Sequence, residues 1–184
     1  MRQLVRTVVT ALMFLSGHQL AAGGYELSSL MRALAIRESN GDYGVVNSLG
    51  YLGAYQFGEP ALLDLGFYSG DATPDVNDWT GAWTGKAGVH SRDDFLAKVA
   101  AQDQAMREWL ELLWRYASHP DLQLDSYVGR SVKGIPISKS GVLAGAHLVG
   151  IFGVAAFLRS DGVEDTRDPF GVPVSEYVRT FERD

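Results

Sequence analysis

One segment near the end of the chain restricts the fold more than any other feature of the sequence. Residues 142–149 are small or apolar except for one histidine, and residues 154–158 repeat this character. Each segment predicts a helix that is apolar on nearly every side. Such a helix has no face to offer to water, so other elements must enclose it. We therefore expect a helical core built around this part of the chain.

Helical periodicity elsewhere predicts a mainly α fold with six or seven helices and little strand. N-capping residues, a proline at a first turn and a glycine at a helix end mark the boundaries. The expected helices are Ser28 or Ser29 to about Glu38, Pro60 to Gly66, one opened by Ser91 and Asp94 as a capping box, Gln102 to Tyr116, and Ser175 to Phe181.

Composition limits the classes of function. The chain has 184 residues, 46% of them hydrophobic, which suits one domain with a core of its own. It contains no cysteine, so disulfides, cysteine-ligated zinc and a cysteine nucleophile are excluded. The net charge of −6 argues against nucleic acid as a partner, because phosphate binding needs a basic face.

The N-terminus has the three-part pattern of a secretory signal. Arg2 and Arg6 precede a short apolar run at residues 8–15, and small residues follow where a peptidase can cut. The run is too short to span a membrane, which takes about 20 apolar residues. We expect a signal peptide over residues 1–22, a domain over 25–184, and a periplasmic or secreted protein. The alternative is a buried N-terminal helix.

Glu38 is the leading candidate for chemistry. It ends an apolar helix and precedes a glycine-rich loop over residues 40–58, so its carboxylate is expected against an apolar wall, facing a cleft. A glycosidase general acid needs such a place, because burial disfavours the charged form of a carboxyl group. The alternative is a solvated glutamate at a helix end, which is what most acidic residues are.

The residues after Glu38 form a recognisable series: Ser39, Gly50, Gly53, Gln56 and Phe57. Their order and spacing resemble the soluble lytic transglycosylase and goose-type lysozyme superfamily, which reads Glu-Ser, then Gly-x-x-Gly, then a hydrophobic pair ending in Gln. Here Ala54-Tyr55 stands where that family has Leu-Met.

A second block strengthens the resemblance. The family carries Ala-Tyr-Asn-x-Gly, then Val, then an aromatic residue and Leu, and this chain has similar residues at 146–158. His147 stands in the place of the tyrosine, and Leu148 in that of the asparagine. His147 either donates a hydrogen bond to a glycan or to Glu38, or is a structural histidine with satisfied nitrogens.

The resemblance implies an α+β lysozyme-like fold whose helices surround a glycan-binding cleft. It implies a peptidoglycan lytic transglycosylase that cleaves the MurNAc–GlcNAc β-1,4 bond and leaves a 1,6-anhydro product, with Glu38 as acid and then base. Peptidoglycan strands would be the partner, with a secretion apparatus left open as another, and no cofactor is implied. The alternatives are a hydrolytic lysozyme, a chitinase on the same fold, and a glycan-binding module without activity.

Polar and aromatic residues near the motifs are the candidates for substrate binding, because sugar rings stack on aromatic faces. They are Ser39, Ser48, Tyr55, Gln56, Phe57, Trp83 and His147. No metal is expected, because Asp71, Asp75 and Asp78 lack the spacing of a calcium loop. A hydrolase would need a second acid, for which the candidates are Asp42, Asp64, Asp71 and Asp75.

Overall fold

The computed structural model describes residues 27–73 and 76–182. The signal peptide that we predict at residues 1–22 lies outside this part of the chain. The elements are a helix over residues 27–39, which we name the Glu38 helix, then α2 (Glu59–Asp64), β1 (Tyr68–Ser69), β2 (Ala82–Trp83), η1 (Lys86–Gly88), α3 (Arg92–Ala97), α4 (Val99–Ala117), η2 (Leu124–Tyr127), β3 (Ser131–Val132), β4 (Ile135–Pro136), α5 (Lys139–Arg159) and α6 (Val174–Thr180). The described protein is mainly helical, as predicted, with only two short antiparallel hairpins.

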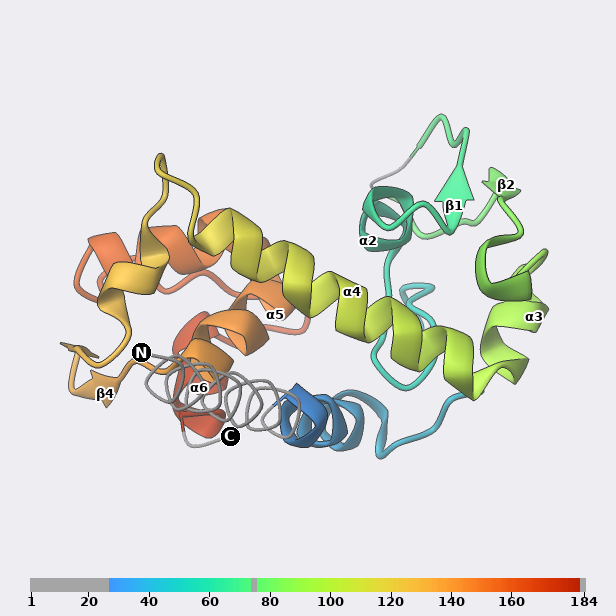
Figure 1. Ribbon diagram of the computed structural model, residues 1–184. Coiled ribbons are helices and arrows are strands. Elements are labelled where there is room, and N and C mark those ends of the chain that lie inside the picture. Colours follow the sequence, from blue (N-terminus) through green and yellow to red (C-terminus); the bar gives the residue numbers. More distant parts are fainter. Residues whose placement is uncertain (1–26, 74–75, 183–184) are drawn as a thin grey trace, which may run out of the picture.

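Helix α4 runs through the middle of the molecule and joins its two ends (Figure 1). The α2, β1, β2 and α3 elements gather at one end of α4, and α5 and α6 pack together at the other. The buried face of α4 includes Ala105, Met106 and Leu110, which recur at helical spacing. The apolar stripe of α4 thus connects the two halves of the core.

Helix α5 is the enclosed helix that the sequence predicts. It bends at Gly150, whose φ of 75° and ψ of 164° are not helical, so the predicted segments 142–149 and 154–158 are its two arms. Among the described helices, α5 alone is long and apolar enough to cross a membrane, but 56% of its most apolar window is buried inside the domain. It therefore behaves here as a core helix.

Small residues let α6 lie directly on α5. A Cβ atom at Gly145 would come within 2.9 Å of Val174, and one at Gly141 within 2.8 Å of the Val178 carbonyl oxygen. Larger side chains at these two positions would push α6 away. This close approach matters because α6 carries a residue of the candidate site.

Two of the predicted helix ends are confirmed and two are wrong. Ser91 caps α3 by accepting a hydrogen bond from the Asp94 amide at 3.0 Å, and Gly66 follows α2 with a φ of 69°. Ser28 and Ser29 lie within the Glu38 helix and do not cap it. Ser175 does not cap α6 either, because Pro173 takes that position and the Ser175 hydroxyl bonds to Asp165 at 2.6 Å.

Candidate active site

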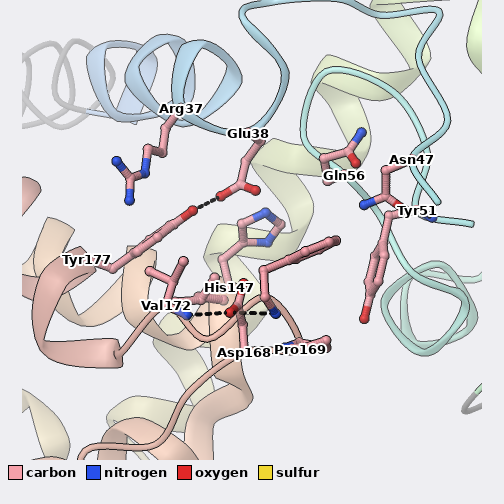
Figure 2. Close-up of a pocket in the computed structure, with 12 residues that line it drawn as sticks. Arg37, Glu38, Asn47, Tyr51, Gln56, His147, Asp168, Pro169, Val172 and Tyr177 are labelled. Carbon is pink, nitrogen blue, oxygen red and sulfur yellow. Dashed lines mark hydrogen bonds between the residues drawn. The ribbon is translucent and has the colours of Figure 1, made fainter. Parts of the chain in front are cut away.

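Glu38 faces a cavity of about 420 Å³ that lies between the end of its helix, the loop over residues 40–58, α5 and the C-terminal segment (Figure 2). The residues that line it are Arg37, Glu38, Asn47, Tyr51, Gln56, His147, Leu148, Asp168, Pro169, Phe170, Val172 and Tyr177. The structure thus brings together Glu38, Gln56 and His147 from the two motif blocks that the sequence analysis singled out.

Tyr177 of α6 holds the Glu38 carboxylate. Its hydroxyl donates a hydrogen bond to Glu38 Oε1 at 2.5 Å (Figure 2). Burial raises the pKa of Tyr177 well above its usual range, and the negative charge of Glu38 acts in the same direction. The phenol therefore stays protonated and acts as a donor at neutral pH.

Arg37 forms a second contact between the Glu38 helix and α6. Its guanidinium forms an ion pair with Glu176 of α6 and lies 5.2 Å from the centroid of the Tyr177 ring. Both Arg37 and Glu176 are partly exposed, so the ion pair itself contributes little to stability. The guanidinium thus covers one face of the Tyr177 ring next to Glu38.

Ser39 lies behind the cavity and not in it. Its hydroxyl is within hydrogen-bonding distance of the Ala54 carbonyl oxygen at 2.9 Å and accepts from the Asp42 amide at 3.0 Å. These bonds tie the loop over residues 40–58 to the end of the Glu38 helix. Ser39 therefore does not line this cavity, and its predicted role in binding substrate stays a prediction.

Gly53 is required by a close approach of Gln102. A Cβ atom at Gly53 would lie 2.0 Å from Gln102 Oε1, and the φ of Gly53 is +71°. Gln102 is fully buried, accepts from the Ala54 amide at 3.0 Å, and donates to the carbonyl oxygens of Tyr43 and Phe95, each at 2.9 Å. This side chain, which the sequence analysis did not single out, holds the loop in place from the side of α4.

Gln56 reaches the cavity from the end of this loop. Its backbone has a φ of 50°, and its side-chain amide donates to the Gly53 carbonyl oxygen at 2.8 Å. Asn47 and Tyr51 stand on the same wall (Figure 2). The placement of Gln56 in the cavity agrees with the predicted site, and its role in binding substrate stays a prediction.

Both ring nitrogens of His147 have hydrogen-bond partners inside the protein. Its Nδ1 accepts from the Trp109 indole at 3.2 Å, and its Nε2 donates to the Tyr55 carbonyl oxygen at 2.9 Å. Because the Trp109 indole can only donate, these partners suit the tautomer that carries its proton on Nε2. Of the two interpretations of His147, the contacts favour the structural one, although its ring edge still lines the cavity.

Four other residues predicted to bind substrate do not line the cavity. Phe57 is fully buried and Tyr55 is 2% exposed, because the tight turn between them and Leu52 directs both rings into the core. Trp83 stacks on Trp79 at a centroid distance of 5.5 Å, over in the β1–β2 hairpin. The fourth, Ser48, is exposed in a turn. None of the four therefore lines the Glu38 cavity, although Tyr55 lines a separate one beside Tyr43 and Asp103, and their roles in binding substrate stay predictions.

The C-terminal segment supplies cavity residues that sequence reasoning missed. Asp168 accepts hydrogen bonds at one carboxylate oxygen from the amides of Phe170 at 3.0 Å and Val172 at 2.7 Å. This turn holds the Phe170 ring at the cavity, where it is 59% exposed. No local pattern links these residues or Tyr177 to Glu38, because they meet it only through the packing of α6 on α5.

Comparisons of the chain with protein-family models, with curated proteins and with solved structures find no match. The geometry of the cavity and the motif resemblance are therefore what bears on function.

Proposed function

We propose that this protein is a peptidoglycan lytic transglycosylase, exported to the periplasm or beyond, with a lysozyme-like domain. It would cleave the MurNAc–GlcNAc β-1,4 bond of glycan strands and leave a 1,6-anhydro end. The observation that carries the proposal is the Glu38 carboxylate, which faces a cavity at a helix end and is held by the Tyr177 hydroxyl.

A single carboxyl group is sufficient for this reaction. Protonated Glu38 gives its proton to the glycosidic oxygen, the bond to C1 of the muramic acid breaks, and the substrate's acetamido group stabilises the cation. The ionised carboxylate then takes the proton of the 6-hydroxyl, and that oxygen closes on C1. No water is consumed, and Glu38 ends in its starting protonation state. Tyr177 would orient the carboxylate through both steps.

The walls of the cavity suit a glycan. Tyr51 and Phe170 present partly exposed aromatic rings for the apolar faces of sugars, while Asn47 and Gln56 place amide groups nearby for hydroxyl and acetamido groups. A glycan-binding module without activity would need these walls equally. It would not need a tyrosine to hold the carboxylate of Glu38 in one position.

Hydrolytic lysozyme is the second candidate, and Asp168 is the observation that favours it. An inverting hydrolase needs a second carboxylate to activate water across the sugar ring from the acid. Asp168 lines the same cavity as Glu38. Asp42, Asp64 and Asp71 do not line it, and Asp75 lies outside the described residues. The site that we would examine for the base is therefore Asp168.

Analysis of the products tests the proposal directly. Purified sacculi are digested with the protein and the muropeptides are examined by mass spectrometry. The Glu38→Gln variant, which we expect to be inactive, is the negative control. We expect anhydro ends, which are lighter than hydrolysed ends by one water. Mainly reducing ends would establish the hydrolase instead. Cleavage of chitin oligomers but not of sacculi would indicate a chitinase, and binding without any product would indicate a glycan-binding module.

A further inference from the structure

A group of acidic residues stands in the other half of the molecule, near the β1–β2 hairpin. Glu59 opens α2, and Asp71 and Asp78 belong to the loop between β1 and β2. One carboxylate oxygen from each of the three lies within 4.8 Å of the others. Spacing along the chain points only to the aspartates, because Glu59 belongs to a separate element.

Glu59 is what distinguishes this group from an ordinary acidic surface. The residue is fully buried, and while its Oε1 accepts from the Trp79 amide, its Oε2 is buried with no hydrogen-bond partner. The carboxyl group of Glu59 lies beside those of Asp71 and Asp78. A fully buried carboxyl group beside two further carboxylates needs a cation or a proton to neutralise it.

We propose that Glu59, Asp71 and Asp78 bind a hard divalent cation of the Ca²⁺ type. Every side chain in the group offers oxygen, which Ca²⁺ and Mg²⁺ prefer and which softer metals do not require. The Thr80 hydroxyl lies among them, 2.9 Å from Asp78 Oδ1 and 3.3 Å from Asp71 Oδ2, so an uncharged oxygen ligand is also available. The irregular loop favours Ca²⁺, which accepts varied geometry, over Mg²⁺, which demands an octahedron.

The cation would stabilise the wall of the Glu38 cavity that contains Tyr51. The loop that carries Asp71 and Asp78 also supports the turn before Tyr51: Asn77 donates to the Leu49 carbonyl oxygen at 3.1 Å, and the Trp79 indole donates to that of Gly50 at 2.8 Å. A Cβ atom at Gly50 would lie 2.3 Å from the Asn77 carbonyl oxygen, so loop and turn touch closely. Binding of the cation does not depend on the proposed function, but its effect on the cavity would.

Luminescence of Tb³⁺ tests the site, since Trp79 donates its backbone amide to Glu59 and its indole can sensitise a bound lanthanide. The full chain is freed of metal with a chelator and titrated with Tb³⁺, and Ca²⁺ is then added as competitor. We expect one Tb³⁺ per chain, displaced by Ca²⁺, and an unfolding temperature that rises with CaCl₂ more than with MgCl₂ at equal ionic strength.

Two variants and a control make the test specific. Asp78→Asn should weaken binding by about tenfold or more, since affinity follows the number of charged ligands. Glu59→Gln keeps the side-chain shape but removes the buried charge, so it should fold, lose the response to Ca²⁺, and melt no lower than the wild type in chelator. Asp93→Asn, at a side chain that is 85% exposed, should bind as the wild type does.

Three results would overturn the assignment. The first is equal melting of the wild type in chelator and in CaCl₂ with no sensitised luminescence. An infrared band of a protonated carboxyl group at neutral pH, absent from Glu59→Gln, would then show that a proton neutralises the group. The second is a larger response to Mg²⁺ than to Ca²⁺. The third is unchanged Ca²⁺ binding by Glu59→Gln. None of these bears on whether Glu38 cleaves glycan.

Discussion

The hydroxyl of Tyr177 lies 2.5 Å from a carboxylate oxygen of Glu38, although 139 positions of the chain separate the two residues. The contact joins the first described helix to the last. It also gives Glu38 a fixed direction into the cavity, which a solvated glutamate at a helix end would not have. The candidate site is therefore a product of the whole fold and not of the motif around Glu38 alone.

Glu38→Gln should abolish lysis of sacculi while the protein stays folded. The amide keeps the size of the side chain but can neither give nor take the proton, so we expect a loss of roughly 10²–10⁴-fold or more. Turbidity of a sacculus suspension measures the rate, and circular dichroism checks the fold. Glu111→Gln, at an exposed position on α4, is the matched control and should keep full activity. Residual activity of Glu38→Gln within about tenfold of wild type would rule out its assignment as the acid.

Tyr177→Phe should separate the positioning of Glu38 from its chemistry. The variant loses one hydrogen bond and keeps the ring on α6, so unfolding should become easier by about 1 kcal/mol. Activity should fall about ten- to hundredfold, because the carboxylate is no longer held in one direction. Lysis rates and urea unfolding are compared with Tyr116→Phe, whose side chain is 40% exposed. Wild-type activity in Tyr177→Phe would mean that the contact is only structural.

Gly53→Ala should destabilise the protein more than Gly134→Ala. Both glycines have a left-handed φ, +71° and +73°, but only Gly53 has an atom in the way of a Cβ. The conformation alone costs about 1–2 kcal/mol for alanine, and displacing Gln102 should add about 1–3 kcal/mol. Urea unfolding of both variants gives the difference. Equal losses would show that Gln102 can move aside freely.

Asp168→Asn should leave lysis within about threefold of wild type if the reaction is a transglycosylation. The asparagine oxygen can still accept from the amides of Phe170 and Val172, so the turn should persist. A hydrolase that uses Asp168 as its base would instead lose roughly 10²-fold or more, and its products would carry reducing ends. The same turbidity assay and mass spectra decide between the two.

Local patterns in the sequence predict local features of this structure well. The apolar run of α5, the cap at Ser91 and the stop at Gly66 each depend on neighbouring residues alone, and all three are confirmed. The spacing between Glu38 and Gln56 predicts that they lie near one another, and both line the cavity because one loop connects them. The predicted lysozyme-like fold stays a prediction beyond its mainly helical character.

The direction of a side chain is harder to predict within an irregular loop. Tyr55 and Phe57 follow the motif but point into the core, because Leu52 pairs with Phe57 and turns the backbone. Tyr177 and Glu59 could not be found from spacing, since each meets its partners through the packing of distant elements. His147 stands where the family pattern puts a tyrosine, and only its two hydrogen bonds, to Trp109 and Tyr55, reveal its structural role.

The joining of the first and last described helices has a consequence for how the protein is made. A nascent chain in which α6 has not yet been made has Glu38 but lacks Tyr177, so nothing on α6 holds its carboxylate in one direction. Contacts of such wide sequence separation are also slow to form, because closing a long stretch of chain costs entropy first. The candidate site would then be complete only after α6 has been synthesised and packed, so the order of the elements along the chain would itself delay the activity that we propose.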